Sequence, residues 1–250
     1  MNKLGTCASY PAAEFPSEPL LLTQTYLEAL ANIHLTHLRT QRNLAGDEED
    51  AERRYIARHL FAQLAATRYI ADHNTTGPFK LFCDDFRPTN MLVDKDTLQI
   101  TAVLDFEFTN AMPAQFAHEP PWWLLLKGPT RLLDDGQPIQ EFIELYQPRL
   151  EQFLRALEHE EIRINRSHSQ TQRLSSLMRN SWNRGDFWFN LAARNRFDMD
   201  AVFYAYLVIS HFEGKAGPQF LSKDLQQKMG QFVEMKMDQK VLHDLEFDAL

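Results

Sequence analysis

The sequence predicts an α+β fold that is mostly helical and carries a small β-hairpin near its middle. Apolar residues recur at helical spacing before residue 75 and again after residue 138. Between residues 79 and 108 the period changes, and the apolar residues form short runs typical of strands. Because no internal repeat is visible, we expect one domain over residues 23–250, after an extended or poorly ordered segment over residues 1–22.

The first predicted helix covers residues 23–43. Leu27, Leu30, His34 and Leu38 recur on one face of it at successive turns. His34 is flanked by leucines on that face, so we interpret it as a hydrogen-bonded packing residue.

A second helix is predicted over residues 50–74, ahead of a Gly-Pro breaker. The acidic run at 47–50 suits its start, because a helix N-terminus favours negative charge. After the strands the chain becomes helical again and stays so. These later helices are predicted over residues 139–161, with Pro148 inside, and over 171–183, 186–195, 199–212 and 223–242.

Three short apolar runs, at residues 79–83, 90–94 and 98–108, predict strands. The polar turn at 94–97 joins the last two, so Met91 to Val93 should pair with Ile100 to Leu104 as a hairpin. The acids of this turn could suggest a calcium loop. However, the glycine and the distant glutamate of such a loop are missing, which favours a plain hairpin turn.

The charge balance and the cysteine count limit the partners and the location. Lys and Arg total 26 against 34 Asp and Glu, a formal net charge of −8, whereas a general nucleic-acid binder needs a basic face. The two cysteines, Cys7 and Cys83, indicate a reducing compartment rather than a disulfide framework. No stretch approaches the roughly 20 apolar residues of a membrane span, and no signal-peptide core is visible. We expect a soluble, cytoplasmic protein with neither nucleic acid nor membrane as partner.

A polar cluster surrounds the hairpin. Asp85 precedes it by five residues, Asn90 stands at its start and Asp105 at its end, so the fold-back should bring the three together. Oxygen ligands without His or Cys suit Mg²⁺, and a carboxylate off the metal can deprotonate an attacking hydroxyl. Phosphoryl transfer needs little else from side chains. Taken alone, however, Asp84, Asp85 and Asn90 are better explained as a polar turn that caps its own backbone.

The stretch "CDDFRPTNMLVD" followed by "VLDFEF" resembles the aminoglycoside phosphotransferase and choline-kinase-like family of the protein-kinase-like fold. "PPWWLL" and "NSWNRGDFWFN" resemble large fungal members, and the resemblance extends from about Tyr26 onward. It implies Asp85 as the catalytic base, and Asn90 and Asp105 as the residues that bind the metal and the cofactor. It also implies Mg²⁺ and ATP as cofactors and a small-molecule hydroxyl as acceptor. Arg87 would contact the transferring phosphate as a second catalytic residue.

The chain departs from the family pattern in two places. Cys83 stands where the family usually has His, and Asp84 where it usually has Gly. In addition, the 84 residues before Asp85 contain no Gly-x-Gly-x-x-Gly loop. Their only lysines are Lys3, in the tail, and Lys80, too close to the polar loop, so neither stands where the family has the lysine of its N-terminal lobe. We therefore expect a kinase-like C-terminal lobe alone, without the N-terminal β-lobe. The chain could be a truncated gene product, a degenerate paralogue or a fragment of a longer gene product that holds the missing lobe. Two functions stay open: a phosphotransferase that is incomplete without that lobe, or a catalytically inactive, pseudokinase-like scaffold or binding module.

Overall fold

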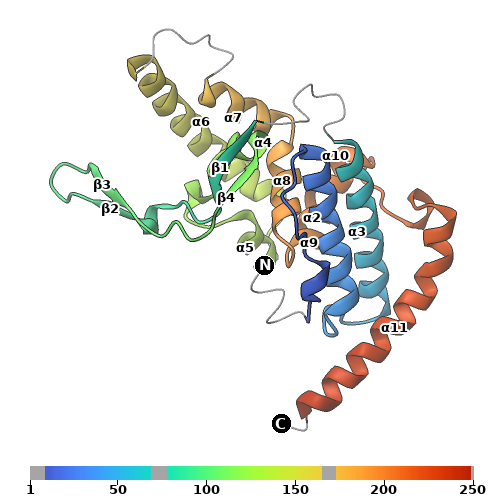
Figure 1. Ribbon diagram of the computed structural model, residues 1–250. Helices are drawn as coiled ribbons and strands as arrows, with labels where there is room; N and C mark the ends of the chain where they lie inside the picture. The colour runs from blue at the N-terminus through green and yellow to red at the C-terminus, as the bar shows by residue number, and fades with distance from the viewer. Residues whose placement is uncertain (1–8, 69–77, 165–172, 249–250) are drawn as a thin grey trace. The chain divides into compact units, whose positions relative to one another are not determined.

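The structure, a computed structural model, describes residues 9–68, 78–164 and 173–248. It divides into two compact units, Met1–Thr76 with Leu191–Leu250, and Gly77–Asn190. The second boundary falls within helix α8, Asp186–Arg194. Helices dominate both units and the strands are few (Figure 1), which confirms the predicted α+β, mostly helical class. The single domain expected over residues 23–250, and its limit at residue 22, stay predictions.

The first unit is helical throughout the residues described. Helix α2, Thr23–Thr40, buries the face predicted for it, including Leu27, His34 and Leu38. In the segment before it, Tyr10 is buried and stacks on Phe15. The remaining elements of this unit besides part of α8 are η1 Ala12–Glu14, α3 Glu48–Thr67, α9 Met199–Val202, η5 Phe203–Leu207, α10 Val208–His211, η6 Pro218–Phe220 and α11 Lys223–Asp248.

Helix α3 begins where the acidic run predicted a start. The carboxylate of Asp47 accepts a hydrogen bond of 2.8 Å from the backbone N–H of Asp50, which caps the first turn. Asp50 in turn accepts from the backbone N–H of Gly46 at 3.0 Å. The helix ends at Thr67, while residues 69–74 of the predicted helix lie outside the described residues.

A buried ion pair lies at the centre of the first unit. The guanidinium of Arg58 is fully buried and donates to both carboxylate oxygens of Asp200, at 3.1 and 2.8 Å. Arg58 also donates to the backbone oxygen of His34 at 2.8 Å, and Arg54 donates to Asp200 at 2.8 Å. Every charge in this cluster is therefore matched by a hydrogen-bonded partner, as burial requires.

The second unit holds all the strands that the structure describes, together with a layer of helices. Its strands are β1 Phe79–Cys83, β2 Met91–Val93, β3 Ile100–Val103 and β4 Thr109–Pro113. Its helices and turns, besides the first part of α8, are η2 Pro88–Asn90, α4 Ala114–Ala117, η3 Trp122–Leu125, α5 Pro129–Asp134, α6 Ile139–Ile164 and α7 Leu174–Asn183. Pro148 lies inside α6, as predicted.

The four strands form one antiparallel ribbon in two parts, residues 79–113. In the first part β1 pairs with β4, from Phe79 opposite Pro113 to Cys83 opposite Thr109. In the second part β2 pairs with β3, with Met91 opposite Val103, which confirms the predicted hairpin. Strand β4 was not predicted, because its sequence "TNAMP" has one β-branched residue, Thr109, no aromatic residue, and an Asn and a Pro that strands disfavour.

Aromatic side chains form the core of the second unit. Phe142 and Tyr146 of α6 pack against Trp182, Phe187 and Trp188, with ring centroids 4.8 to 6.0 Å apart. The hydroxyl of Tyr146 donates to the backbone oxygen of Pro121 at 2.8 Å, which satisfies its one buried polar group. In the part of the chain that the structure describes, no helix is both long and apolar enough for a membrane span.

Candidate active site

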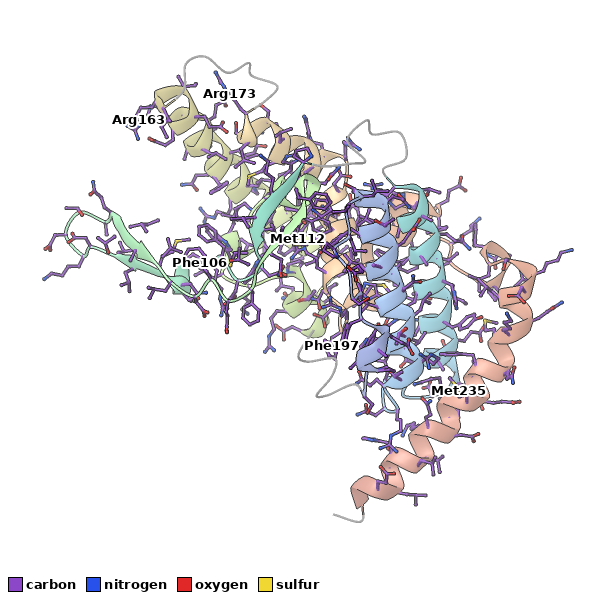
Figure 2. All side chains as sticks on the ribbon, viewed as in Figure 1. Phe106, Met112, Arg163, Arg173, Phe197 and Met235 are labelled. Carbon is purple, nitrogen blue, oxygen red and sulfur yellow. The ribbon has the colours of Figure 1, made fainter. Side chains whose placement is uncertain are left out.

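The ribbon is interrupted where the polar cluster lies. Between its two paired parts, residues 84–90 and residues 104–108 form two loops that face each other, here called the facing loops. Backbone hydrogen bonds join them at both ends: Asp84 N–H to Phe108 O at 3.4 Å, and Leu104 N–H to Asn90 O at 2.8 Å. The two loops therefore cannot separate without breaking the ladder on either side. Figure 2 labels Phe106 in one of these loops and Met112 in β4.

Asp85 is held from two sides by residues of its own loop. The side-chain amide of Asn90 donates to its Oδ2 at 3.0 Å and also to its backbone oxygen at 2.8 Å. Arg87 forms an ion pair with its Oδ1 at 2.8 Å. The side chain of Asp85 is 24% exposed and that of Arg87 42% exposed, so the carboxylate is partly sheltered while the guanidinium reaches solvent. Three of the four predicted site residues are thus in direct contact.

The amide of Asn90 is oriented by these bonds. Because its nitrogen points to Asp85, its oxygen Oδ1 points away from Asp85. A turn of 3-10 helix, η2 Pro88–Asn90, sets this position, with the backbone N–H of Asn90 bonded to Arg87 O at 3.0 Å. The oriented amide oxygen is a hard ligand of the kind that Mg²⁺ accepts.

Asp105 enters from the opposite loop. The bond between Leu104 and Asn90 fixes the residue before it, which places Asp105 beside the position of Asn90. Its backbone has φ 64, a left-handed conformation in which aspartate is several-fold enriched among residues other than glycine. The side chain is exposed, and the chain turns sharply there before β4 begins. Backbone pairing therefore sets the position of the Asp105 main chain, and the place of its side chain beside the other three residues stays a prediction.

The surroundings of the site were not predicted. Phe86 lies in the first facing loop, and Phe106 and Phe108 lie in the second; all three are exposed. Among the described residues, no group of three or more His, Cys, Asp or Glu side chains is arranged to hold a metal ion. The roles predicted for Asn90 and Asp105 as metal ligands stay a prediction.

The turn at the far end of the ribbon has a structural role. Asp94 Oδ1 accepts from the backbone N–H of Asp96 at 3.0 Å, and from the N–H and hydroxyl of Thr97 at 2.8 and 2.9 Å. These hydrogen bonds to the charged form lower the pKa of the Asp94 carboxyl, the backbone bond from Thr97 most of all. Oδ1 of Asp94 thus closes the turn between β2 and β3, which confirms the predicted hairpin turn.

Comparison with known proteins adds one finding. The sequence model described as the Phosphotransferase enzyme family matches residues 7–158, more than half of the chain and the part that contains the facing loops. No curated protein and no solved structure matches the chain.

Proposed function

The chain belongs to the phosphotransferase enzyme family, and on that premise we propose that its facing loops transfer the γ-phosphoryl group of ATP to a hydroxyl of a small molecule. The observation that carries this proposal is the contact of Asp85 with Asn90, across from Asp105, within a ribbon whose ends are tied together. Each of these residue types has a task in phosphoryl transfer.

Asn90 and Asp105 fit a magnesium ion by the chemistry of their donor atoms. The amide oxygen of Asn90 is turned away from Asp85, and the carboxylate of Asp105 is exposed on the opposite loop. When bound, Mg²⁺ would neutralise charge on the phosphate oxygens. The aminoglycoside-type acceptor is only one possibility within such a family, because acceptors vary on one fold.

Asp85 would take the proton from the acceptor hydroxyl as its oxygen attacks the γ-phosphorus. The new O–P bond forms while the bond from the γ-phosphorus to the bridging oxygen breaks, and ADP leaves. The amide of Asn90 keeps Oδ2 of Asp85 oriented. Arg87 pairs with Oδ1, and its side chain is long enough to contact the transferring phosphate instead. These two contacts hold the carboxylate in place before the acceptor arrives.

Two observations favour a second function, that of a catalytically inactive scaffold or binding module. Arg87 occupies one oxygen of Asp85, and the 250 residues contain no Gly-x-Gly-x-x-Gly loop. If the family's nucleotide-binding lobe has no counterpart in the full gene product, the chain would be an inactive, pseudokinase-like scaffold or binding module. If a nucleotide-binding lobe is supplied by another segment, the phosphotransferase is completed by it.

Isothermal titration calorimetry with Mg-ATP separates the two functions. We expect micromolar binding that is lost in Asp105→Ala and kept in Asp85→Asn, because the base does not hold the nucleotide. Asp96→Ala, an exposed acid of the distal turn, is the matched control and should bind as the unchanged protein does. Absence of binding in the unchanged protein would reject a phosphotransferase that works with this chain alone, and would leave the scaffold or an enzyme completed by another segment.

A further inference from the structure

Helix α11 lies along α3 and beside the C-terminal end of α2, within the first unit (Figure 1). Among its residues 223–246, whose burial the structure describes, Lys236 is the only one that is buried. Three apolar side chains of the same helix are instead more than half exposed, namely Val241, Leu242 and Leu245. A helix held by an apolar stripe shows the opposite pattern. Apolar burial therefore holds α11 in place only weakly.

Apart from its middle, α11 is attached in its first half and near its end. In the first half, the hydroxyl of Tyr55 donates to the backbone oxygen of Leu225 at 3.0 Å, and its ring packs on Phe232 with centroids 4.9 Å apart. Near the end, Glu246 accepts two hydrogen bonds from Arg42, at 3.0 and 2.6 Å. This pair is exposed, and exposed ion pairs contribute little to stability. The contact that remains to fix the helix is the one at its middle.

That middle contact completes the C-terminal end of α2. Nζ of Lys236 donates to the backbone oxygen of Gln41 at 2.7 Å, and Nε2 of Gln239 donates to that of Arg39 at 3.1 Å. The last carbonyls of a helix have no partner within it, so these bonds from another helix satisfy them. Lys236 also donates to Oε1 of Gln239 at 2.7 Å. The ammonium thus lies where the dipole of α2 favours positive charge.

The charge of Lys236 nevertheless has no counter-charge. Among the described residues no carboxylate forms an ion pair with it, and both acceptors of its hydrogen bonds are uncharged. The charged groups that act on it are Arg58 and Arg54 of α3, both already paired with Asp200. Burial, followed by these two guanidinium groups, lowers the pKa of Lys236 to about 8. Because lysine is almost never fully buried without a partner, this contact disfavours the docked helix as long as the amine is charged.

The hydrogen bonds of Lys236 need only the neutral amine. A neutral amine has two hydrogens, and Lys236 makes two hydrogen bonds. Loss of one proton therefore removes the uncompensated charge and keeps both bonds. His37, which bonds to Gln41, and His59 of α3 stay neutral above pH 7, because burial lowers the pKa of each to about 4. Burial also raises the pKa of Tyr55 above its usual value near 10, so this phenol keeps its proton up to pH 9.

Gly230 weakens α11 as a helix on its own. A side chain at this position would meet nothing within 4 Å, so no close contact requires the glycine. Glycine inside a helix lowers helical stability relative to alanine. Since most of the stability of a helix in a protein comes from its packing, α11 should lose its helical hydrogen bonds once it leaves α3.

We propose that α11 is a displaceable cover of α3, which opens and closes while α2 and α3 stay folded, and that Lys236 is its latch. Elements that move are those with few buried apolar contacts, and α11 is such an element. Opening would uncover the aromatic pair of α3, Tyr55 and His59, whose ring centroids lie 4.3 Å apart; Tyr55 is only 4% exposed while α11 is docked. The helix thereby controls access to this face of α3.

Hydrogen exchange followed by mass spectrometry tests the opening. On the unchanged chain at pH 7, we expect the amides of α11 to exchange through one common opening. Those of α2 and α3 should stay protected until the whole unit unfolds. Gly230→Ala should make the opening about fivefold rarer, because alanine favours the helix over the opened chain.

The role of Lys236 is tested by pH. From pH 7 to pH 9 the opening constant of α11 should fall about tenfold, because the pKa is about 8 in the docked helix and returns to its usual value near 10.5 in the opened one. Exchange rates are compared after division by those of an unstructured chain at each pH, under conditions in which closing is faster than exchange. Lys236→Met should abolish the pH dependence, and so should Lys236→Arg, which stays charged throughout. Lys228→Met, at an exposed lysine of the same helix, is the matched control and should keep it.

Any of four results would overturn the proposal. If α11 exchanges only together with α2 and α3, it is an integral part of the unit; if it has no protection at all, it is not docked. An opening constant that does not change with pH, or one that still changes in Lys236→Met and Lys236→Arg, would reject Lys236 as the latch. None of these measurements needs Mg-ATP or an acceptor, so their outcome does not depend on the phosphotransferase proposal.

Discussion

Among single residues, Asp200 is expected to have the largest effect on stability. Its carboxylate is the partner of the fully buried guanidinium of Arg58 and also of Arg54. Asp200→Ala would leave the buried guanidinium of Arg58 without its counter-charge, while Arg54 keeps Asp50 at 2.9 Å. Removing one partner of a buried pair costs about 3–5 kcal/mol. Urea denaturation of the first unit, followed by circular dichroism, measures this loss.

Asp224→Ala is the control for that measurement. Asp224 pairs with Lys228 at 2.8 Å, but both side chains are more than 60% exposed. An exposed pair of this kind contributes about 0–1 kcal/mol. Equal losses in the two variants would mean that the burial of Arg58 has no energetic consequence, and would contradict the interpretation of the cluster.

The residues of the candidate site could be found from the sequence, but their bonds could not. The spacing around a hairpin predicted that Asp85, Asn90 and Asp105 come together. The structure shows the contact of Asp85 with Asn90, and the place of the Asp105 side chain beside them stays a prediction. The ion pair of Arg87 with Asp85 lies just before the turn of 3-10 helix η2, of which Arg87 is the N-cap and which the sequence did not indicate. The assignment of catalytic and metal-binding roles stays a prediction, because no measured ligand contact tests it.

Elements with strong periodicity were predicted well. Helices α2, α3, α6, α7 and α11 were all expected from apolar spacing, and the α2 face was predicted residue by residue. The hairpin of β2 and β3 was also predicted, since its turn residues fix the register.

Strand β4 is an element that apolar periodicity could not predict. Its residues Thr109 to Pro113 pair with β1 because the ribbon continues past the facing loops, and not because they favour strands. The short helices α4 and α5 span too few residues to show a period. Such elements are set by their neighbours, so a local pattern could not identify them.

At the scale of the whole molecule, the resemblance that the sequence predicted is confirmed by the family match. The description as a kinase-like C-terminal lobe and the cytoplasmic location stay predictions. The division into two compact units was not predicted. The first unit joins the two ends of the chain, and such long-range packing leaves no mark in local spacing.

Stability of the first unit should fall in mild acid. Burial, followed by the charge of Arg58, lowers the pKa of His34 far below its usual value and that of His37 to about 4; burial alone lowers the pKa of His59 to about 4. In the unfolded chain these groups take up protons near pH 6.5, while in the folded unit His37 and His59 do not until about pH 4. Between those values the unfolded state binds more protons, so lowering the pH favours unfolding.

The expected slope is at most about 1.4 kcal/mol per pH unit for each fully buried histidine between pH 6.5 and 4. Urea midpoints measured from pH 7.5 to pH 5 give this slope. His37→Gln should flatten it, because the variant has no proton to gain at that position. Stability that is constant over the range, or that rises as the pH falls, would contradict the buried, neutral state of these histidines.

The central claim is that the facing loops gather Asp85, Asn90 and Asp105 around one divalent cation. Paramagnetic broadening by Mn²⁺ in nuclear magnetic resonance spectra of the isotope-labelled chain tests it without a nucleotide or an acceptor. Asp96→Asn serves as the control that leaves the site intact. We predict that the amide signals of residues 85, 90 and 105 broaden first, and that Asp105→Asn abolishes this order. Broadening that starts instead at the acidic run 47–50 or at the turn 94–96, or that Asp105→Asn does not change, would contradict the claim.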